Sequence, residues 1–508
     1  MAWVDEADPS KPAQVLLVAE VAGAGKTALA HSIGHRCQER GVLKTSFFFR
    51  RDSAELSTPV KLITTLARDL SSDSGAFAQR VCDIIDKERS LASNFSYRQF
   101  EELILKPSSV LPMDKPLVII IDALDECAER LDMNILLNIL QDGVPQLPGM
   151  FRFLVTSRPT PDVDEDLTRH PHVLRQSLDL HERSNLSDIH KYVSHSLVKI
   201  FKGKEPDAGL VEDFSVATEG LFIWAFTVVA HLSRAFAPES ALRRILEKHH
   251  PEQLPTDTKM NLLYTDIMER HYWDDPDFVQ AYQAVMGMVL AAKEPLPISV
   301  LAALNPGTSL ETFAAVLQQL HAVLHYEPMK PIRVLHKSFH DFLVTCSPDR
   351  PYYINVIDHE EQMAIFCLDI LNKRLKMPIP GTGYLVDNTS QSKGIPYISN
   401  ESVSEELWYS CQFWMDHCIS MSVMSAPSTV TAAIQELIER NFVQWTEICT
   451  SKSSFTGLSH HFLTWLKVSL LWWITFVYLM FQSLCYQVCR KWYIQFLIYK
   501  HCHFCRGD

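Results

Sequence analysis

The feature that most constrains this 508-residue chain is a short glycine-containing loop between an apolar run and a helix-forming stretch. Residues 14–19 read QVLLVA, residues 20–27 read EVAGAGKT and residues 28–33 read ALAHSI. A short, uninterrupted apolar run is typical of a buried parallel strand, and the residues after the loop favour a helix. The pattern predicts a strand, a phosphate-binding loop and a helix, because such a loop directs backbone N–H groups at phosphate.

The loop predicts roles for single residues. Lys26 is expected to reach the β- and γ-phosphates of a triphosphate, and the Thr27 hydroxyl to bind Mg²⁺. Glu20 stands where the motif has its first glycine, and a carboxylate near phosphate adds repulsion, which puts affinity and turnover in question. The predicted nucleotide-binding residues of the loop are Gly23, Ala24, Gly25, Lys26 and Thr27. Taken alone, residues 20–27 could also form a glycine-rich turn before an ordinary helix.

Two further apolar runs end in polar residues that would complete such a site. The run LVIII ends at Asp122, with Asp125 and Glu126 just beyond it. Open α/β sheets bind ligands at the carboxyl ends of their strands, so we predict that Asp122 holds the metal and that Asp125 and Glu126 orient or activate water. The run FRFLVTS ends at Arg158, whose guanidinium could sense a γ-phosphate. Each run alone could also end in a solvated or capped turn.

Together these three sites resemble the NACHT class of signal-transducing P-loop ATPases (the STAND class), in the nephrocystin-3-like N-terminal form abundant in filamentous fungi. Supporting stretches are SFFFR at 46–50, FEELILKP at 100–107, EGLFIWA at 219–225, VLHKSFHDFL at 334–343 and YSCQFWMDH at 409–417. The resemblance spans roughly residues 10–470. It implies an ATP/ADP- and Mg²⁺-dependent switch, a weak ATPase at most, that self-associates in signalling such as fungal non-self recognition or programmed cell death.

The resemblance also implies a role for His336. In the family, the matching histidine lies in a winged-helix domain and contacts the β-phosphate of ADP, which holds the closed state. An imidazole can donate a hydrogen bond to phosphate, so this chemistry is sound. From the residues alone, the competing interpretation is a core histidine packed between Leu335 and Phe339.

The order of these motifs predicts an α/β fold in several modules: a parallel P-loop NTPase sheet, then a helical subdomain, a winged helix and an all-α C-terminal region. The expected boundaries are an N-terminal extension at 1–11, a nucleotide-binding domain at 12–180, a helical subdomain at 181–270, a winged helix at 271–350, a helical region at 351–460 and a hydrophobic tail at 461–508. Family members usually carry an effector domain before the ATPase and repeats after the helical region. We expect neither in this chain.

The tail contains a candidate membrane span. Residues 468–488 carry no charged side chain, and a helix of that length is about 30 Å long, the thickness of a bilayer core. Arg490 and Lys491 favour a cytosolic C-terminus, yet the nucleotide-binding domain on the other side also needs the cytosol. A helix packed on the preceding bundle and a misread exon end are therefore alternatives. Cys502 and Cys505, flanked by histidines, could bind zinc.

Composition argues against several classes of protein. The net charge is −13 and no basic stripe is present, which argues against nucleic-acid binding. Residues 1–6 are acidic and lack a basic region followed by an apolar core, so we expect no secretory signal. Scattered single cysteines indicate a reducing compartment. We expect a cytoplasmic protein, attached to a membrane only if residues 468–488 span one. The alternative from another class is a scaffold or interaction protein, or a truncated product, with a degenerate nucleotide site.

Overall fold

The computed structural model describes residues 2–5, 13–51, 56–92, 95–112, 115–127, 130–249, 255–383, 398–399, 401–420 and 428–451. The chain divides into two compact units. The first unit contains residues 1–271, 320–325 and 334–342, and the second contains 272–319, 326–333 and 343–508. Within the described residues, no helix is long and apolar enough to cross a membrane. The candidate span at 468–488 and the candidate zinc ligands Cys502 and Cys505 lie outside them.

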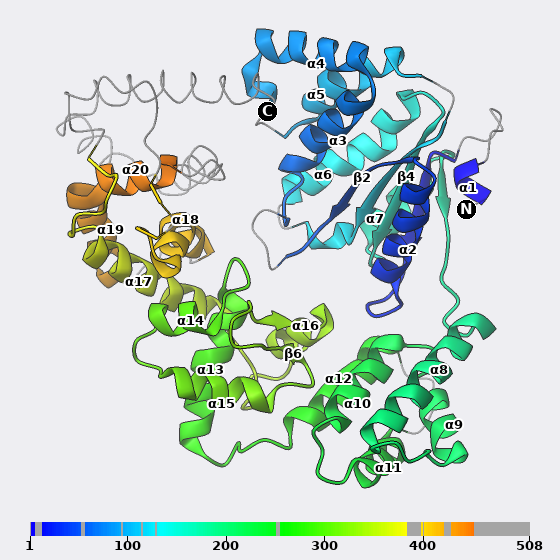
Figure 1. Ribbon diagram of the computed structural model, residues 1–508, viewed down its shortest axis with the longest axis vertical. Coiled ribbons are helices and arrows are strands. Elements are labelled where there is room, and N and C mark those ends of the chain that lie inside the picture. The colour runs from blue at the N-terminus through cyan, green and yellow to red at the C-terminus, as the bar shows by residue number, and fades with distance from the viewer. Residues whose placement is uncertain are drawn as a thin grey trace. The chain divides into compact units, whose positions relative to one another are not determined.

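The first unit is built on a five-stranded parallel sheet with the order β2-β3-β4-β1-β5 (Figure 1). Its strands are β1 (Val15–Ala19), β2 (Leu43–Phe48), β3 (Leu117–Asp122), β4 (Phe151–Ser157) and β5 (Val173–Arg175). Strands β3 and β4 are buried at every position, as expected for central parallel strands with both faces covered. The predicted α/β fold of P-loop type is confirmed.

Helices cover both faces of this sheet because alternate strand residues point to opposite sides. Val118 and Ile120 pack with α1 (Ala2–Asp5) and α2 (Lys26–Glu39), whereas Ile119 and Ile121 pack in a larger core with the other helices. These are α3 (Val60–Asp73), α4 (Gly75–Lys87), α5 (Tyr97–Phe100), α6 (Arg130–Asn138) and α7 (Pro161–Thr168). Short 3₁₀ or π turns are η1 (Arg89–Ala92), η2 (Glu101–Leu105), η3 (Pro107–Val110), η4 (Leu124–Glu126), η5 (Ile139–Gly143) and η6 (Val144–Gln146).

Helices follow the sheet in the first unit. They are α8 (Arg183–Ile200), α9 (Ala208–Ala217), α10 (Phe222–Leu232), α11 (Pro238–Lys248) and α12 (Thr256–Met268). Gly220, in the turn before α10, has φ +80°, and a Cβ there would lie 2.1 Å from the carbonyl oxygen of Leu180. The Asn185 amide donates to the carbonyl oxygens of both Leu180 and Gly220, at 2.7 and 2.9 Å. The start of α10 is therefore fixed to the segment that leaves β5.

Two short strands and one helix near residue 330 contribute to the first unit through residues 320–325 and 334–342. They are β6 (Leu324–His325), β7 (Arg333–Val334) and α16 (Lys337–Thr345), and β6 pairs with β7. Ser338 of α16 hydrogen-bonds the buried Tyr264 hydroxyl of α12 at 2.8 Å. Phe339 and Phe342 pack on the same tyrosine, with ring centroids 5.1 and 5.5 Å away. The first turns of α16 are thus held against the helical part of this unit.

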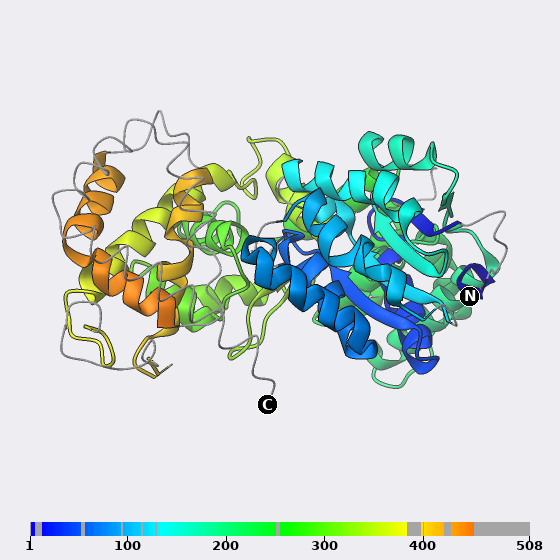
Figure 2. The same cartoon turned by 90° about the horizontal axis from the view of Figure 1, so that it is seen from above.

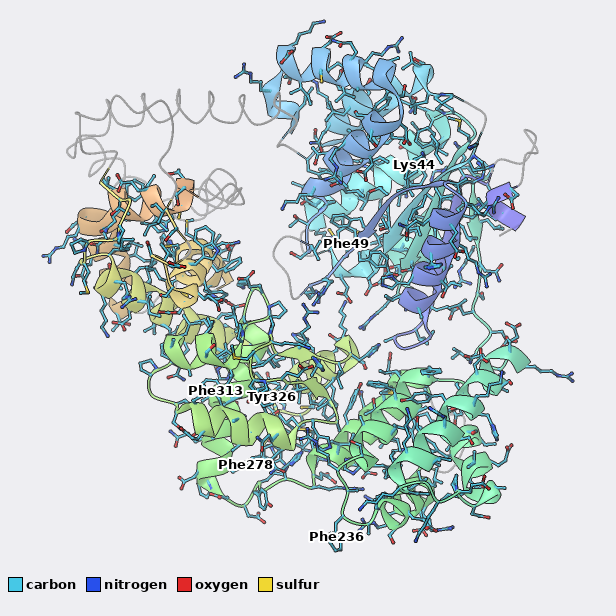
Figure 3. The ribbon with its side chains drawn as sticks, in the orientation of Figure 1. Lys44, Phe49, Phe236, Phe278, Phe313 and Tyr326 are labelled. Atoms are coloured by element: carbon cyan, nitrogen blue, oxygen red, sulfur yellow. The ribbon has the colours of Figure 1, made fainter. Side chains whose placement is uncertain are left out.

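The second unit is helical. It contains α13 (Pro276–Ala291), α14 (Ile298–Leu304), α15 (Leu310–Gln319), α17 (Val356–Arg374), α18 (Glu405–Ser420), α19 (Ser428–Glu436), η8 (Leu437–Asn441) and α20 (Phe442–Ser451). Helices α17 to α20 form its yellow-to-orange part in Figure 2. Phe313 of α15, labelled in Figure 3, is fully buried in this unit. Cysteines in the described part of the chain are free thiols, most of them buried.

Candidate nucleotide site

The loop between β1 and α2 adopts a backbone that needs glycine at two positions. Gly23 has φ +81° and Gly25 has φ +88°, a region that side chains other than glycine rarely enter. A Cβ on Gly23 would also lie 2.2 Å from Cγ2 of Ile223, at the start of α10, whereas a Cβ on Gly25 would meet open space. Because the first N–H groups of a helix have no intrahelical acceptor, the start of α2 suits an anion.

The ammonium of Lys26 lies over this loop. Its Nζ donates to the carbonyl oxygens of Glu20 and Val21, at 2.6 and 2.8 Å. Burial lowers the pKa of Lys26, and the nearby carboxylates of Asp125 and Asp122 oppose that shift. An ammonium that is partly desolvated and hydrogen-bonded to carbonyl oxygens is well placed to exchange those partners for phosphate oxygens.

Thr27 and Asp122, the two predicted metal ligands, are in direct contact. The Thr27 hydroxyl donates to Oδ2 of Asp122 at 2.8 Å, across 95 residues of sequence. Oδ1 of the buried Asp122 accepts from the hydroxyl of Thr156, a residue that the sequence reasoning missed. Hydroxyl and carboxylate oxygens are the ligands that Mg²⁺ prefers, and the loop beside them suits phosphate, so these residues fit a magnesium nucleotide. The signal for Thr156 was its place near the end of a parallel strand beside β3.

The two predicted catalytic carboxylates accept hydrogen bonds from different backbone N–H groups. Asp125 accepts from the backbone N–H of Arg158 at 3.0 Å, and its Oδ2 lies 3.4 Å from Nε of the same arginine. Burial raises the pKa of Asp125, but the charge of Lys337 and the Arg158 contacts outweigh it, so the net shift is downward. Glu126 accepts instead from the backbone N–H of Arg51 at 3.1 Å. Asp125 is therefore the carboxylate coupled to Arg158.

Glu20, the residue in place of the first glycine, points its carboxylate at the chain that leaves β5. Its Oε1 accepts from the backbone N–H of Leu178 at 3.1 Å. Among the described residues, left-handed φ values outside glycine occur at Ala123, Lys202 and Glu219, so the Glu20 backbone does not demand glycine. The carboxylate that raised the question of phosphate repulsion has a structural partner of its own.

The structure brings His336 to the loop. Its ring Cε1 lies 3.9 Å from where a Cβ would stand on Gly23. Burial, together with the charges of Arg158 and Lys26, lowers the pKa of His336 to about 4, so the ring is neutral at pH 7. Nδ1 accepts from the backbone N–H of Ser338 at 3.2 Å, and we therefore assign the ring proton to Nε2. His336 thus has a donor available beside the loop.

Two charged residues of α16 contact the other predicted site residues. Lys337 Nζ lies 3.2 Å from Oδ2 of Asp125 and 3.7 Å from Oε1 of Glu126. Nη1 of Arg158 lies 2.8 Å from Oδ2 of Asp341. Burial alone would raise the pKa of Asp341. The hydrogen bond with His340 and the charge of Arg158 outweigh this effect and lower the pKa to about 2. Sequence reasoning assigned no role to Lys337 or Asp341, although both lie in the stretch that contains His336.

Comparison with known proteins gives two sequence matches. The family described as Nephrocystin 3, N-terminal, matches residues 1–158. The vegetative incompatibility protein HET-E-1 of Podospora anserina is 23% identical over 328 residues, which are 59% of this chain and 22% of that protein. The chain thus spans about a fifth of the length of that curated relative.

Solved structures give weak overall similarity. A Walker-type ATPase of Pyrococcus abyssi is 12% identical at a TM-score of 0.29, over 66% of this chain and 96% of that chain. Drosophila ORC bound to DNA is 15% identical at a TM-score of 0.28, over 65% of this chain and 80% of that chain. Aeropyrum pernix ORC1 in complex with DNA is 13% identical at a TM-score of 0.27, over 67% of this chain and 88% of that chain. TM-scores of this size do not bear on the fold, which rests on strand order and loop geometry. The glycine loop between β1 and α2 and the five-stranded parallel sheet have the arrangement of a P-loop NTPase fold.

Proposed function

We propose that this chain is an ATP/ADP- and Mg²⁺-dependent molecular switch of the NACHT type. The observation that carries the proposal is the meeting of two distant segments at one loop: Lys26 and Thr27 of the loop itself, and His336 beside Gly23. A nucleotide held by both segments would make their contact depend on its phosphates. Such dependence is what a two-state switch requires.

The roles of the site residues follow from their positions. The loop backbone, with Gly23, Ala24 and Gly25, would hold phosphate, and Lys26 would add a positive charge. Thr27 and Asp122 would hold Mg²⁺. When bound, Mg²⁺ supplies charge neutralisation at the phosphates. Asp125, with Glu126, would orient water, and Arg158 would sense the terminal phosphate.

His336 would act as the ligand that distinguishes the closed state. Its neutral ring offers an Nε2–H donor and adds no charge to the site. The residue is joined through Ser338 to Tyr264 of α12, which would connect the phosphate contact with the helical part of the unit. Loss of the His336 contact would free α16 and its neighbours, and the surfaces they cover would become available for self-association.

Similarity to a vegetative incompatibility protein supports a signalling role, in fungal non-self recognition or programmed cell death, with self-association as its output. The match covers 22% of that protein, so this part of the proposal extends only to the segment shared with it. A scaffold with a degenerate nucleotide site is the rival, favoured by Glu20 in place of glycine. The Glu20 contact with Leu178 weakens that case.

Nucleotide titration of the whole purified chain tests the proposal. We expect ATP and ADP to bind in the presence of Mg²⁺, with GTP as the competitor that defines base preference. Lys26→Ala should weaken binding by roughly 10- to 100-fold, the worth of one charge-assisted hydrogen bond. Lys87→Ala, at the exposed end of α4, is the matched control and should leave binding unchanged. Wild-type protein that binds neither nucleotide would favour the scaffold.

A further inference from the structure

Helix α16 carries two opposite charges, Lys337 and Asp341, one turn apart. Each pairs with a predicted catalytic residue: Lys337 with Asp125, and Asp341 with Arg158. We propose that these two ion pairs are inhibitory contacts that suppress ATP hydrolysis in the closed state, separately from the hold of His336 on the nucleotide. The inference rests on the proposed function and concerns the regulation of that same site.

The Lys337 contact disables Asp125 as a base. Both carboxylate oxygens are engaged: Oδ1 accepts from the backbone N–H of Arg158 at 3.0 Å, and Oδ2 lies 3.2 Å from Lys337 Nζ. A general base must accept a proton through a lone pair that faces the attacking water. A carboxylate shared between an ammonium and a guanidinium has little basicity to offer, because both neighbours stabilise its ionised form.

The Asp341 contact occupies Arg158. Nη1 of the arginine is paired with Asp341 at 2.8 Å, while Nε lies 3.4 Å from Asp125. Recognition of a phosphate by arginine uses the same fork of N–H groups. While Asp341 holds that fork, Arg158 cannot give its full charge to a terminal phosphate. Because Lys337 and Asp341 share one helix, undocking of α16 would separate both contacts at once.

The docking of α16 does not depend on these charges alone. Ser338 is hydrogen-bonded to the buried Tyr264 hydroxyl, and Phe339 packs on the same ring. Removal of the Lys337 charge should therefore leave the helix in place and release Asp125. For this reason a substitution of Lys337 tests the effect of its charge on Asp125 without undocking α16.

Single-turnover hydrolysis of Mg²⁺·ATP by the whole chain tests the inference. We expect Lys337→Met to raise the rate about tenfold or more, which is less than the roughly 100-fold or more of a fully positioned base because Arg158 still contacts Asp125. The ATP dissociation constant should stay within about threefold of wild type. Asp341→Asn should raise the rate less, and the double variant should exceed either single one. Lys337→Arg keeps the positive charge and should keep the wild-type rate. Lys330→Met, which removes an exposed lysine paired with Glu327, is the matched control and should change nothing.

The outcomes are distinct. Variants that bind ATP like the wild type but hydrolyse it no faster overturn the inhibitory contacts and leave the proposed function intact. A slower rate with a lower melting temperature in Lys337→Met assigns the lysine a structural role only, which also overturns the inference. A wild-type chain that binds no nucleotide overturns both proposals.

Discussion

Two ionic clusters in this protein are built from similar residues in different surroundings. The site cluster lies at the phosphate loop and alternates in charge through Lys337, Asp125, Arg158 and Asp341. Its side chains are 9% to 31% exposed. The helical cluster lies in the second unit, where Glu360 of α17 bonds both Lys293 at 2.6 Å and His417 of α18 at 2.5 Å.

The members of the helical cluster bond to one another in a closed network. His417 is fully buried and bonds Tyr409 at 2.8 Å, and the Tyr409 hydroxyl accepts from the backbone N–H of Lys293. Burial lowers the pKa of His417 and raises that of Tyr409. Every member thus has a partner inside the protein, as a buried polar network requires. Breaking such a network leaves uncompensated groups, whereas the partly exposed site cluster can exchange its partners for water. The first suits permanent structure and the second suits a contact that must separate.

The largest expected effect is in the helical cluster. Glu360→Ala should lower the free energy of unfolding of the second unit by about 3–5 kcal/mol, because it strands a buried histidine and a lysine. Hydrogen exchange of α17 and α18 under increasing denaturant measures it. Asp369→Ala removes an exposed pair with Lys373 on the same helix and should cost less than about 0.5 kcal/mol. Equal costs would erase the contrast between buried and exposed pairs.

The next effect is acid sensitivity at His336. Its folded pKa of about 4 is below the ordinary value of 6.5, so the unfolded chain binds the proton more readily. The neutral ring therefore makes its full contribution to the free energy of unfolding above pH 6.5, and this contribution is lost as the pH falls through about 4. The loss is about 3 kcal/mol at most. Thermal unfolding from pH 7 to 4 should show a steeper loss in wild type than in His336→Gln. Parallel pH curves would contradict the neutral buried ring. The low pKa values of His231 and His271 contribute equally to both proteins.

A smaller effect is expected at Asp341. Asp341→Asn removes one charge of the site cluster and should cost about 1 kcal/mol, because the pair with Arg158 is partly exposed. Salt should lower the melting temperature of wild type more than that of the variant, since exposed pairs are screened. The exposed Asp166, paired with Arg169, is the control, and Asp166→Asn should have almost no effect. A salt response unchanged by Asp341→Asn would mean that the pair contributes nothing.

The smallest effect is expected at Glu20. Glu20→Gln keeps an acceptor for the Leu178 N–H and should change stability by less than about 1 kcal/mol, whereas Glu20→Gly leaves that donor without its partner and costs about 1 kcal/mol. Calorimetry measures the change in stability, and ATP titration measures the change in affinity. We expect ATP affinity of Glu20→Gln within about threefold of wild type. A tenfold gain would show that the carboxylate repels phosphate after all.

Local patterns predicted the sheet well where strands are fully buried. The apolar runs at 14–19, 117–121 and 151–157 match β1, β3 and β4 closely. The stretch SFFFR at 46–50, which supported the family resemblance, overlaps β2, which begins three residues earlier, at Leu43. Strand β2 lies at the edge of the sheet, so it admits polar residues such as Lys44, which pairs with Asp73 and is labelled with Phe49 in Figure 3. An edge strand carries less apolar signal than a central one.

The site was predictable only where chemistry lies within a motif. The loop and Asp122 follow from strand ends, whose position in a parallel sheet is general. The contact of Lys337 with Asp125 joins residues 212 positions apart, and it depends on how α16 docks against α12. Nothing in the local periodicity around Lys337 encodes its partner. The contact of Glu20 with Leu178 spans 158 positions and was hidden for the same reason.

The two glycines of the loop have different consequences for how this sequence can vary. Gly25 is restricted by its backbone angle alone, because a side chain there would meet open space. Gly23 is restricted twice, since its missing Cβ is also the space into which Ile223 of α10 fits. A substitution at Gly23 together with a smaller residue at position 223 would restore the fit but still leave the backbone strained. The side chains that position 23 can accept thus depend on Ile223, a residue about 200 positions further along the chain in the first turn of α10.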